Sequence, residues 1–198
     1  MKIYGDRKSG NCYKVQLVCN FLDIDHEWVD VDILAGGTRS EDFLKMNPNG
    51  KIPVLELDDG EILTESNAII NYLASGSALY PDGGLAQARV LQWQFFEQYS
   101  HEPFIAVARF INKYLGLPEE KAGEYASKQV GGHKALKVME NQLATSAYIA
   151  GEDFTTADIS LYAYTHVAHE GGFDLAAYPA VQSWLDRVAA LPNFKGMA

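Results

Sequence analysis

The sequence predicts two domains of different class, an α/β domain over residues 1–80 and an all-α domain over residues 85–198. Short strand-like and helix-like segments alternate in the first range, whereas apolar residues recur at helical spacing through almost all of the second. A Pro-Asp-Gly-Gly segment at residues 81–84 interrupts both patterns and marks the boundary. A chain of 198 residues is long enough to bury a core in each of two small domains.

In the first domain the predicted order of elements is strand, helix, strand, helix, strand, strand, helix. Alternating or β-branched residues mark the strands, and apolar residues three and four apart mark the helices. The strands are expected at residues 2–4, 26–31, 52–57 and 61–63, and the helices at residues 13–22, 41–44 and 66–74. Strand–helix–strand units imply a partly parallel sheet covered by helices, and the Asp-Asp-Gly turn at residues 58–60 adds an antiparallel hairpin.

The second domain is predicted to consist of helices alone. A long periodic stretch covers residues 85–115, and Pro103 within it should kink or end a helix. Another helix begins at Pro118, where proline and the acids that follow suit a first turn, and it is weakened by the glycine pair at residues 131–132. Further helices are expected to begin near Thr155 and Pro179.

Composition and charge exclude several classes of function. Apolar residues make up 47% of the chain and charged residues 21%, as in ordinary globular proteins. The formal net charge of −10 disfavours nucleic acid and anionic membranes as partners, because both are themselves negatively charged. No apolar run approaches the roughly 18 residues of a membrane span.

The cysteines and histidines do not suggest disulfide or metal chemistry. Cys12 and Cys19 lie about 10 Å apart if they share one helix, which is too far for a disulfide bond. The N-terminus lacks an apolar signal segment, so we expect a cytoplasmic protein with free thiols. His166 and His169 have chelating spacing, but no carboxylate–histidine set accompanies them, so no metal is expected.

The segment Ser9-Gly10-Asn11-Cys12 lies between the first strand and the first helix, where backbone N–H groups and the helix dipole stabilise an anion. A Cys-x-x-Cys pair here would indicate redox chemistry, but Ser9 occupies the first cysteine position. The Ser9 hydroxyl can donate a hydrogen bond to a bound thiolate and so lower the pKa of that thiol, with Asn11 as a second donor. In the alternative, Ser9 only caps the helix and Cys12 is a small buried apolar residue.

Two later segments can also hold a ligand. The Ile52–Pro53 bond is either cis, which would present the Ile52 backbone to an extended peptide, or trans at the start of an edge strand. At the start of the next predicted helix, Ser66 suits a carboxylate and Glu65 suits an ammonium, as in an α-amino acid head group. Simple helix capping is the alternative for this pair.

Together these segments resemble one family. The patterns SxxCYKV at residues 9–15, NPxGKIPVL at 47–55 and LTESxAI at 63–69 are similar to the N-terminal thioredoxin-like domain of cytosolic glutathione transferases, in the bacterial form with serine or cysteine in the first motif. The stretch GEDFTTADI at residues 151–159 resembles a motif of the family's helical domain. In that stretch Thr155 and Asp158 have the spacing of a capping box. The resemblance spans essentially the whole chain and implies the glutathione transferase fold.

The resemblance also implies how glutathione would be held. The bond before Pro53 is cis in the family, and the Ile52 backbone binds the cysteinyl part of glutathione. The residues that match those holding the γ-glutamyl end are Glu65 and Ser66. The residues expected near the glycyl carboxylate are Lys51 and Arg39.

Thiol activation is assigned first to Ser9, because serine-type members of the family place the activating hydroxyl at this position. Asn11 is its helper, and Tyr4 ranks third because some classes use a tyrosine close to the first strand. Cys12 is a departure from the pattern. Relatives that form a mixed disulfide with glutathione and act as thiol reductases usually carry their reactive cysteine at the position that Ser9 occupies here.

For the second substrate we expect a pocket that includes Tyr4, His101, Phe104 and Arg109. His101 and Arg109, with Glu102, form a polar group inside an apolar helix pair. This group either contacts an anionic co-substrate or forms a core network or a dimer contact.

The expected function is conjugation of the glutathione thiolate to small, largely apolar electrophiles, as in detoxification. Glutathione is the expected co-substrate, and a homodimer is the assembly that the resemblance suggests. One alternative is a glutathione-dependent thiol/disulfide reductase or peroxidase that uses Cys12. Another is a non-catalytic binding module built on the same fold.

Overall fold

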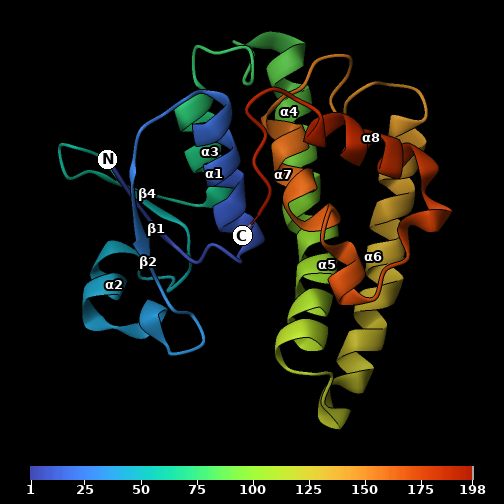
Figure 1. Cartoon of the computed structure of the whole chain (residues 1–198), viewed down its shortest axis with the longest axis horizontal. Helices are drawn as coiled ribbons and strands as arrows, with labels where there is room; N and C mark the ends of the chain where they lie inside the picture. The colour runs from blue at the N-terminus through green and yellow to red at the C-terminus, as the bar shows by residue number, and fades with distance from the viewer. Residues whose placement is uncertain (198) are drawn as a thin grey trace. The chain divides into compact units, whose positions relative to one another are not determined.

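The computed structural model describes residues 1–197, which form two compact units (Figure 1). The first unit contains Met1–Ser77 and the C-terminal segment that begins at Pro192, and the second contains Ala78–Leu191. The first is α/β and the second is helical, which confirms the predicted fold class. No helix in the described part of the chain combines the length and the apolar character needed to cross a bilayer.

The first unit is built on a four-stranded mixed sheet with the order β2-β1-β3-β4. β1 (Lys2–Gly5) pairs in parallel with β2 (Glu27–Asp30) and antiparallel with β3 (Val54–Glu56). β3 in turn pairs antiparallel with β4 (Ile62–Thr64). The partly parallel sheet with an antiparallel hairpin follows the order of elements that the sequence predicts.

Helices cover both faces of this sheet. α1 (Gly10–Phe21) and α3 (Ser66–Ala74) pack side by side, and α2 (Glu41–Met46) lies on the other face, where Phe43 joins a cluster with residues of the sheet (Figure 1). Gly5 is required where α1 crosses β1. A Cβ atom there would lie 2.7 Å from the sulfur of Cys12, so the missing side chain allows the helix to approach the strand.

The second unit contains five α-helices with shorter helical segments between them. They are α4 (Gly84–Phe96), α5 (Glu102–Arg109), α6 (Ala122–Leu143), α7 (Thr156–Thr165) and α8 (Pro179–Ala189). Every residue of α7 is buried, so this helix forms the centre of the unit.

The start of α7 confirms the predicted capping box. The Thr155 side chain accepts from the first-turn backbone, and the Asp158 carboxylate accepts from the Thr155 N–H at 2.9 Å. Asp158 is completely buried and also accepts from the Ile149 N–H at 2.8 Å and from the Trp184 indole N–H at 2.9 Å. One carboxylate therefore ties α7 to the preceding loop and to α8.

The long stretch around Pro103 is interrupted as predicted, with a detail that periodicity does not reveal. α4 is followed by a π-helical segment, η2 (Glu97–His101), and Pro103 lies in the first turn of α5. Proline fits there because the first turn of a helix needs no N–H donor at that position. A second π-helical segment, η3 (Phe110–Tyr114), follows α5.

The glycine pair in α6 does not break the helix, which continues for 22 residues. The two glycines make room for aromatic rings instead. A Cβ atom at Gly131 would collide with the ring of Phe104, and one at Gly132 would collide with the ring of Phe173. The loss of helix propensity is thus offset by close packing between helices.

Candidate functional site

The first candidate group lies where β1 leads into α1. Ser9 is the N-cap residue of α1 and is half-buried, but its side chain makes no capping hydrogen bond. Instead it hydrogen-bonds the thiol of Cys12. The structure therefore disfavours a pure capping role for Ser9 and leaves its hydroxyl at the positive end of a helix.

The Cys12 thiol is buried and has a raised pKa in this structure. Its side chain is fully buried, and burial raises its pKa to about 12, although the Ser9 hydrogen bond acts in the opposite direction. A thiol with this pKa stays protonated at neutral pH, and the thiolate is the nucleophilic form. The geometry thus disfavours Cys12 as a nucleophile and matches the alternative of a small buried residue.

A chain of hydrogen bonds connects α1 with the start of α3. The Lys14 ammonium donates to the Ser66 hydroxyl at 3.3 Å, and this hydroxyl donates to the Asn11 side-chain oxygen at 3.2 Å. Ser66 is almost fully buried at the first position of α3. The structure therefore brings together two predicted site residues, Asn11 and Ser66, and adds Lys14, to which the sequence analysis did not assign a role.

The segment before β3 has the geometry expected of a peptide-binding edge. The Ile52–Pro53 bond is cis, as the family resemblance implies. Asn47 holds the preceding turn, since its side chain donates to the Lys51 carbonyl at 2.7 Å and accepts from the Asn49 N–H at 3.1 Å. The backbone N–H and C=O groups of Ile52 take no part in the sheet pairing between β1, β3 and β4.

Two other residues predicted to bind the ligand, Glu65 and Arg39, are exposed at the surface of this unit. Glu65 is exposed and has a φ of 68°, an uncommon backbone conformation for a residue other than glycine. It is the N-cap of α3, but its side chain makes no capping hydrogen bond. Arg39 is also exposed, and its guanidinium lies against Gly50, next to Lys51. Two cationic side chains thus come from separate elements to the same turn.

The geometry disfavours Tyr4 as the residue that activates the glutathione thiol. Its hydroxyl donates to a Glu56 carboxylate oxygen at 2.5 Å, and this hydrogen bond is the main cause that raises the pKa of Tyr4 to about 12. The same bond lowers the pKa of Glu56. The side chain packs against the cluster of Val31, Phe43 and Val54, which contains a residue of α2. Cys12, by contrast, belongs to α1 on the opposite face.

The remaining residues predicted for the second-substrate pocket have partners inside the helical unit. His101 is fully buried, and its Nε2 lies 2.9 Å from the Thr165 hydroxyl. Phe104 packs against the backbone of α6 at Gly131. The structure favours the core-network alternative for these two side chains, and their assignment to a pocket stays a prediction.

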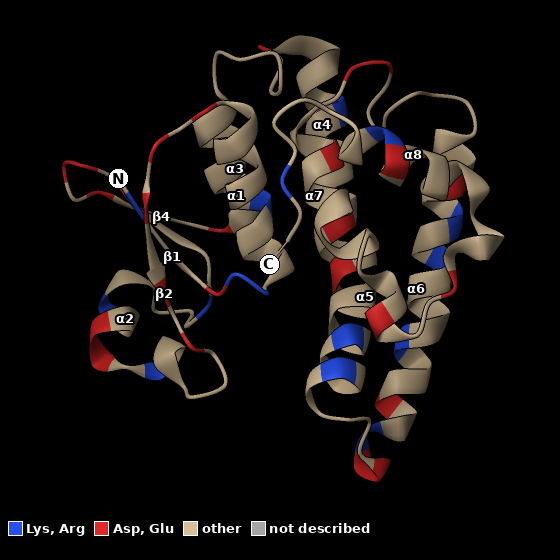
Figure 2. Ribbon diagram, in the orientation of Figure 1, with Lys and Arg blue, Asp and Glu red and all other residues tan. Residues whose placement is uncertain are grey.

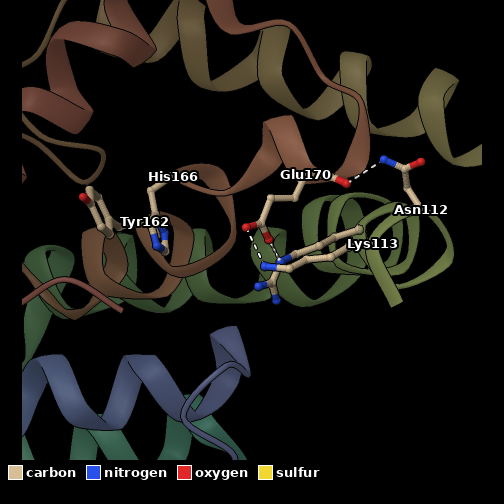
Figure 3. Close-up of polar contacts among 6 residues, drawn as sticks. Asn112, Lys113, Tyr162, His166 and Glu170 are labelled. Atoms are coloured by element: carbon tan, nitrogen blue, oxygen red, sulfur yellow. Dashed lines mark hydrogen bonds and ion pairs between the residues drawn. The ribbon is translucent and has the colours of Figure 1, made fainter. Parts of the chain in front are cut away.

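Arg109 belongs to an ion cluster around Glu170. Its Nε donates to Glu170 at 2.5 Å, and Lys113 donates to the other carboxylate oxygen at 2.6 Å. Figure 3 shows Lys113 and Asn112 reaching Glu170, with His166 beside Tyr162. The carboxylate neutralises one of the two cations, so Arg109 serves first as a structural anchor between α5 and the segment after α7.

Sequence reasoning missed Lys14 and the carboxylates Glu56 and Glu170. A signal for Lys14 was present, since it is the one charged residue within residues 10–21, an otherwise apolar and neutral helix. The carboxylates gave no such signal, because their partners are far away in the sequence. Among residues 1–197 no group of three His, Cys, Asp or Glu side chains is placed to hold a metal ion.

Comparison with known proteins identifies the family of both units. Residues 3–79 match the model of the glutathione S-transferase N-terminal domain, and residues 92–192 match that of the C-terminal domain. Glutathione S-transferase 3 of Zea mays is 35% identical, over 98% of this chain and 91% of its own. The disulfide-bond oxidoreductase YfcG of Escherichia coli is 29% identical, over 92% and 87% of the two chains. A crystal structure of a glutathione S-transferase from Pseudomonas fluorescens is 59% identical, with a TM-score of 0.98 over 99% of this chain and 98% of its own.

Proposed function

Because the chain belongs to the glutathione S-transferase family, we propose that it binds glutathione through its first unit and conjugates the glutathione thiolate to small electrophiles. The observation that carries the proposal is the Ser9 hydroxyl, which lies half-buried at the N-terminus of α1 and is not used to cap that helix. A thiolate placed there would receive a hydrogen bond and the favourable field of the helix dipole.

In this proposal the Ile52 backbone pairs with the cysteinyl part of glutathione, which places the sulfur in reach of Ser9. Glu65 and Ser66 hold the γ-glutamyl end, and Arg39 and Lys51 attract the glycyl carboxylate. Support comes from the cis bond at Ile52, the burial of Ser66 and the contact of Arg39 with the turn before Lys51. We keep residues 1–80 and 85–198 as the proposed domains; the family matches to residues 3–79 and 92–192 support a division in this region, while the compact units divide the chain after Ser77 and assign the segment from Pro192 to the first unit.

The proposed chemistry needs no covalent intermediate on the protein. The glutathione thiol gives its proton to water, and the thiolate forms a bond to an electrophilic carbon. The leaving group departs with the electron pair of the bond that breaks. Cys12 takes no part in this step, because burial raises the pKa of its thiol and leaves the glutathione thiolate as the nucleophile.

We expect Cys12→Ser to retain conjugation within about threefold of wild type, because serine keeps a hydrogen-bond acceptor beside Ser9 and replaces a thiol whose pKa is raised by burial. The assay follows formation of the thioether from glutathione and an activated aryl halide. Reduction of a glutathione mixed disulfide is measured on the same two proteins. If Cys12→Ser loses disulfide reduction and wild type shows no conjugation, the reductase alternative replaces the proposal.

We also propose a homodimer that forms through α4 and η2. Leu85, Phe95 and Tyr99 lie along this continuous helical stretch with exposed fractions of 67%, 62% and 79%. Large exposed aromatic side chains at helical spacing are typical of an interface.

We expect Phe95→Glu to weaken the dimer roughly 100-fold, because a charge would then be buried at the centre of the contact. Sedimentation equilibrium measures the dissociation constant. The matched control is Val130→Glu on α6, which is also exposed and should leave the dimer intact. A wild-type protein that sediments as a monomer at micromolar concentration would contradict this assembly.

A further inference from the structure

Lys14 is a buried cation in α1, the helix that begins at the candidate thiol site. Figure 2 draws α1 mostly in tan with a short blue segment, and Lys14 is the basic residue within residues 10–21; its side chain is fully buried. Its neighbours in the sequence, Tyr13 and Val15, belong to the apolar core. A buried ammonium is costly to desolvate, so an apolar residue of the same length would serve packing better. A role in ligand binding therefore explains a buried lysine at this position better than a role in stabilising the fold does.

The contacts of Lys14 show where its charge acts. The ammonium donates to the Ser66 oxygen at 3.3 Å, so this hydroxyl must direct its own proton elsewhere. In the present structure the proton goes to the Asn11 oxygen at 3.2 Å. Ser66 is also the first residue of α3. The side chain of the N-cap residue, Glu65, makes no capping hydrogen bond to the first backbone N–H groups of this helix. The lysine charge and the helix terminus therefore converge on one hydroxyl.

From this arrangement we infer that Lys14 is a positioning residue for the γ-glutamyl carboxylate of glutathione. The inference rests on the proposed function and extends it. By occupying one lone pair of the Ser66 oxygen, Lys14 directs the Ser66 proton away from itself, so that this proton can turn from Asn11 to a carboxylate bound at the start of α3. Its positive charge, held out of water, strengthens the attraction to that carboxylate. A neutral residue at position 14 would leave the hydroxyl free to turn toward other acceptors.

The test compares Lys14→Met with wild type on two ligands. One is glutathione, and the other is 4-aminobutyryl-cysteinyl-glycine, the same peptide without the γ-glutamyl α-carboxylate. We expect Lys14→Met to weaken glutathione binding roughly 10- to 100-fold, as for the loss of one charge-assisted hydrogen bond. The KM for glutathione should rise by the same factor, and kcat at saturation should stay within about threefold. For the analogue, wild type and variant should bind alike, because the carboxylate is missing.

A matched control is Lys45→Met, which removes an exposed lysine on α2 and should leave both affinities unchanged. Lys14→Arg keeps the charge and should keep the preference for glutathione over the analogue. If Lys14→Met does not fold, Lys14→Gln enters the same comparison, since it is neutral and can still donate to Ser66. Equal losses for both ligands, or no loss for either, would overturn the role of Lys14. Failure of wild type to bind glutathione would instead overturn the proposed function.

Discussion

Replacing Ser9 with alanine should lower kcat/KM for conjugation roughly 10- to 100-fold, the equivalent of about 1–3 kcal/mol for one charge-assisted hydrogen bond. The reason is that the alanine variant lacks the hydroxyl that would stabilise the glutathione thiolate at the start of α1. The pKa of bound glutathione should rise by a corresponding amount. Steady-state kinetics with an activated aryl halide, together with the pH dependence of the rate, measure both effects.

The free energy of unfolding of Ser9→Ala should stay close to that of wild type, because the Ser9 side chain makes no capping hydrogen bond. Ser40→Ala is a matched control in the same unit, since the Ser40 hydroxyl does accept from the Phe43 N–H at the start of α2. That variant should lose about 1 kcal/mol of stability and keep its conjugation rate. If Ser9→Ala keeps both the rate and the thiol pKa, activation belongs to Asn11 instead.

Replacing Asp158 with alanine should reduce the free energy of unfolding by about 3–5 kcal/mol at pH 7, because the loss of one partner leaves several buried donors unpaired. Those donors are the backbone N–H groups of Ile149 and Thr155 and the indole N–H of Trp184. Urea unfolding followed by circular dichroism measures the change. Asp174→Ala is the control, because this exposed cap accepts only from the Ala176 N–H and should cost about 1 kcal/mol.

The same carboxyl makes stability depend on pH in a defined direction. Burial raises the pKa of Asp158 to about 6, although four hydrogen bonds partly offset the shift. In the unfolded chain the group releases its proton near its usual pKa of about 4. Its contribution is therefore greatest below pH 4 and is lost as the pH rises to 6. The difference between wild type and Asp158→Ala should widen when the pH is lowered from 7 to 4. A difference below 1 kcal/mol at every pH would contradict the central role of this carboxyl.

Local patterns predicted the fold well because they depend on residues close together in the sequence. Spacing and capping chemistry predicted the order of strands and helices along the chain. They also predicted the helix that starts at Ser66 and the capping box of Thr155 and Asp158. The π-helical segments on either side of α5 did not follow, since they depend on packing against other helices. The glycines of α6 were misleading for the same reason, because the rings that need them come from elsewhere in the chain.

The candidate site divides in the same way. Motif spacing pointed to Ser9 and Ser66, whose roles stay predictions, and the family resemblance implied the cis bond before Pro53, which the structure confirms. Spacing did not reveal that Tyr4 donates to Glu56, because 52 residues separate them. It left open whether Cys12 is buried, and the structure shows that it is, next to Gly5, where a side chain would collide with its sulfur. Contacts between distant residues therefore changed the ranking of the thiol-activating groups and left Ser9 first.

The most direct test of the proposed function is an ultraviolet difference spectrum of the protein titrated with glutathione from pH 5 to 9. A thiolate band should develop well below the usual thiol pKa of about 8.5, which would demonstrate both binding and activation. Saturable binding without such a band below pH 8 would contradict thiolate activation by Ser9. No binding at millimolar glutathione would contradict the proposed function as a whole.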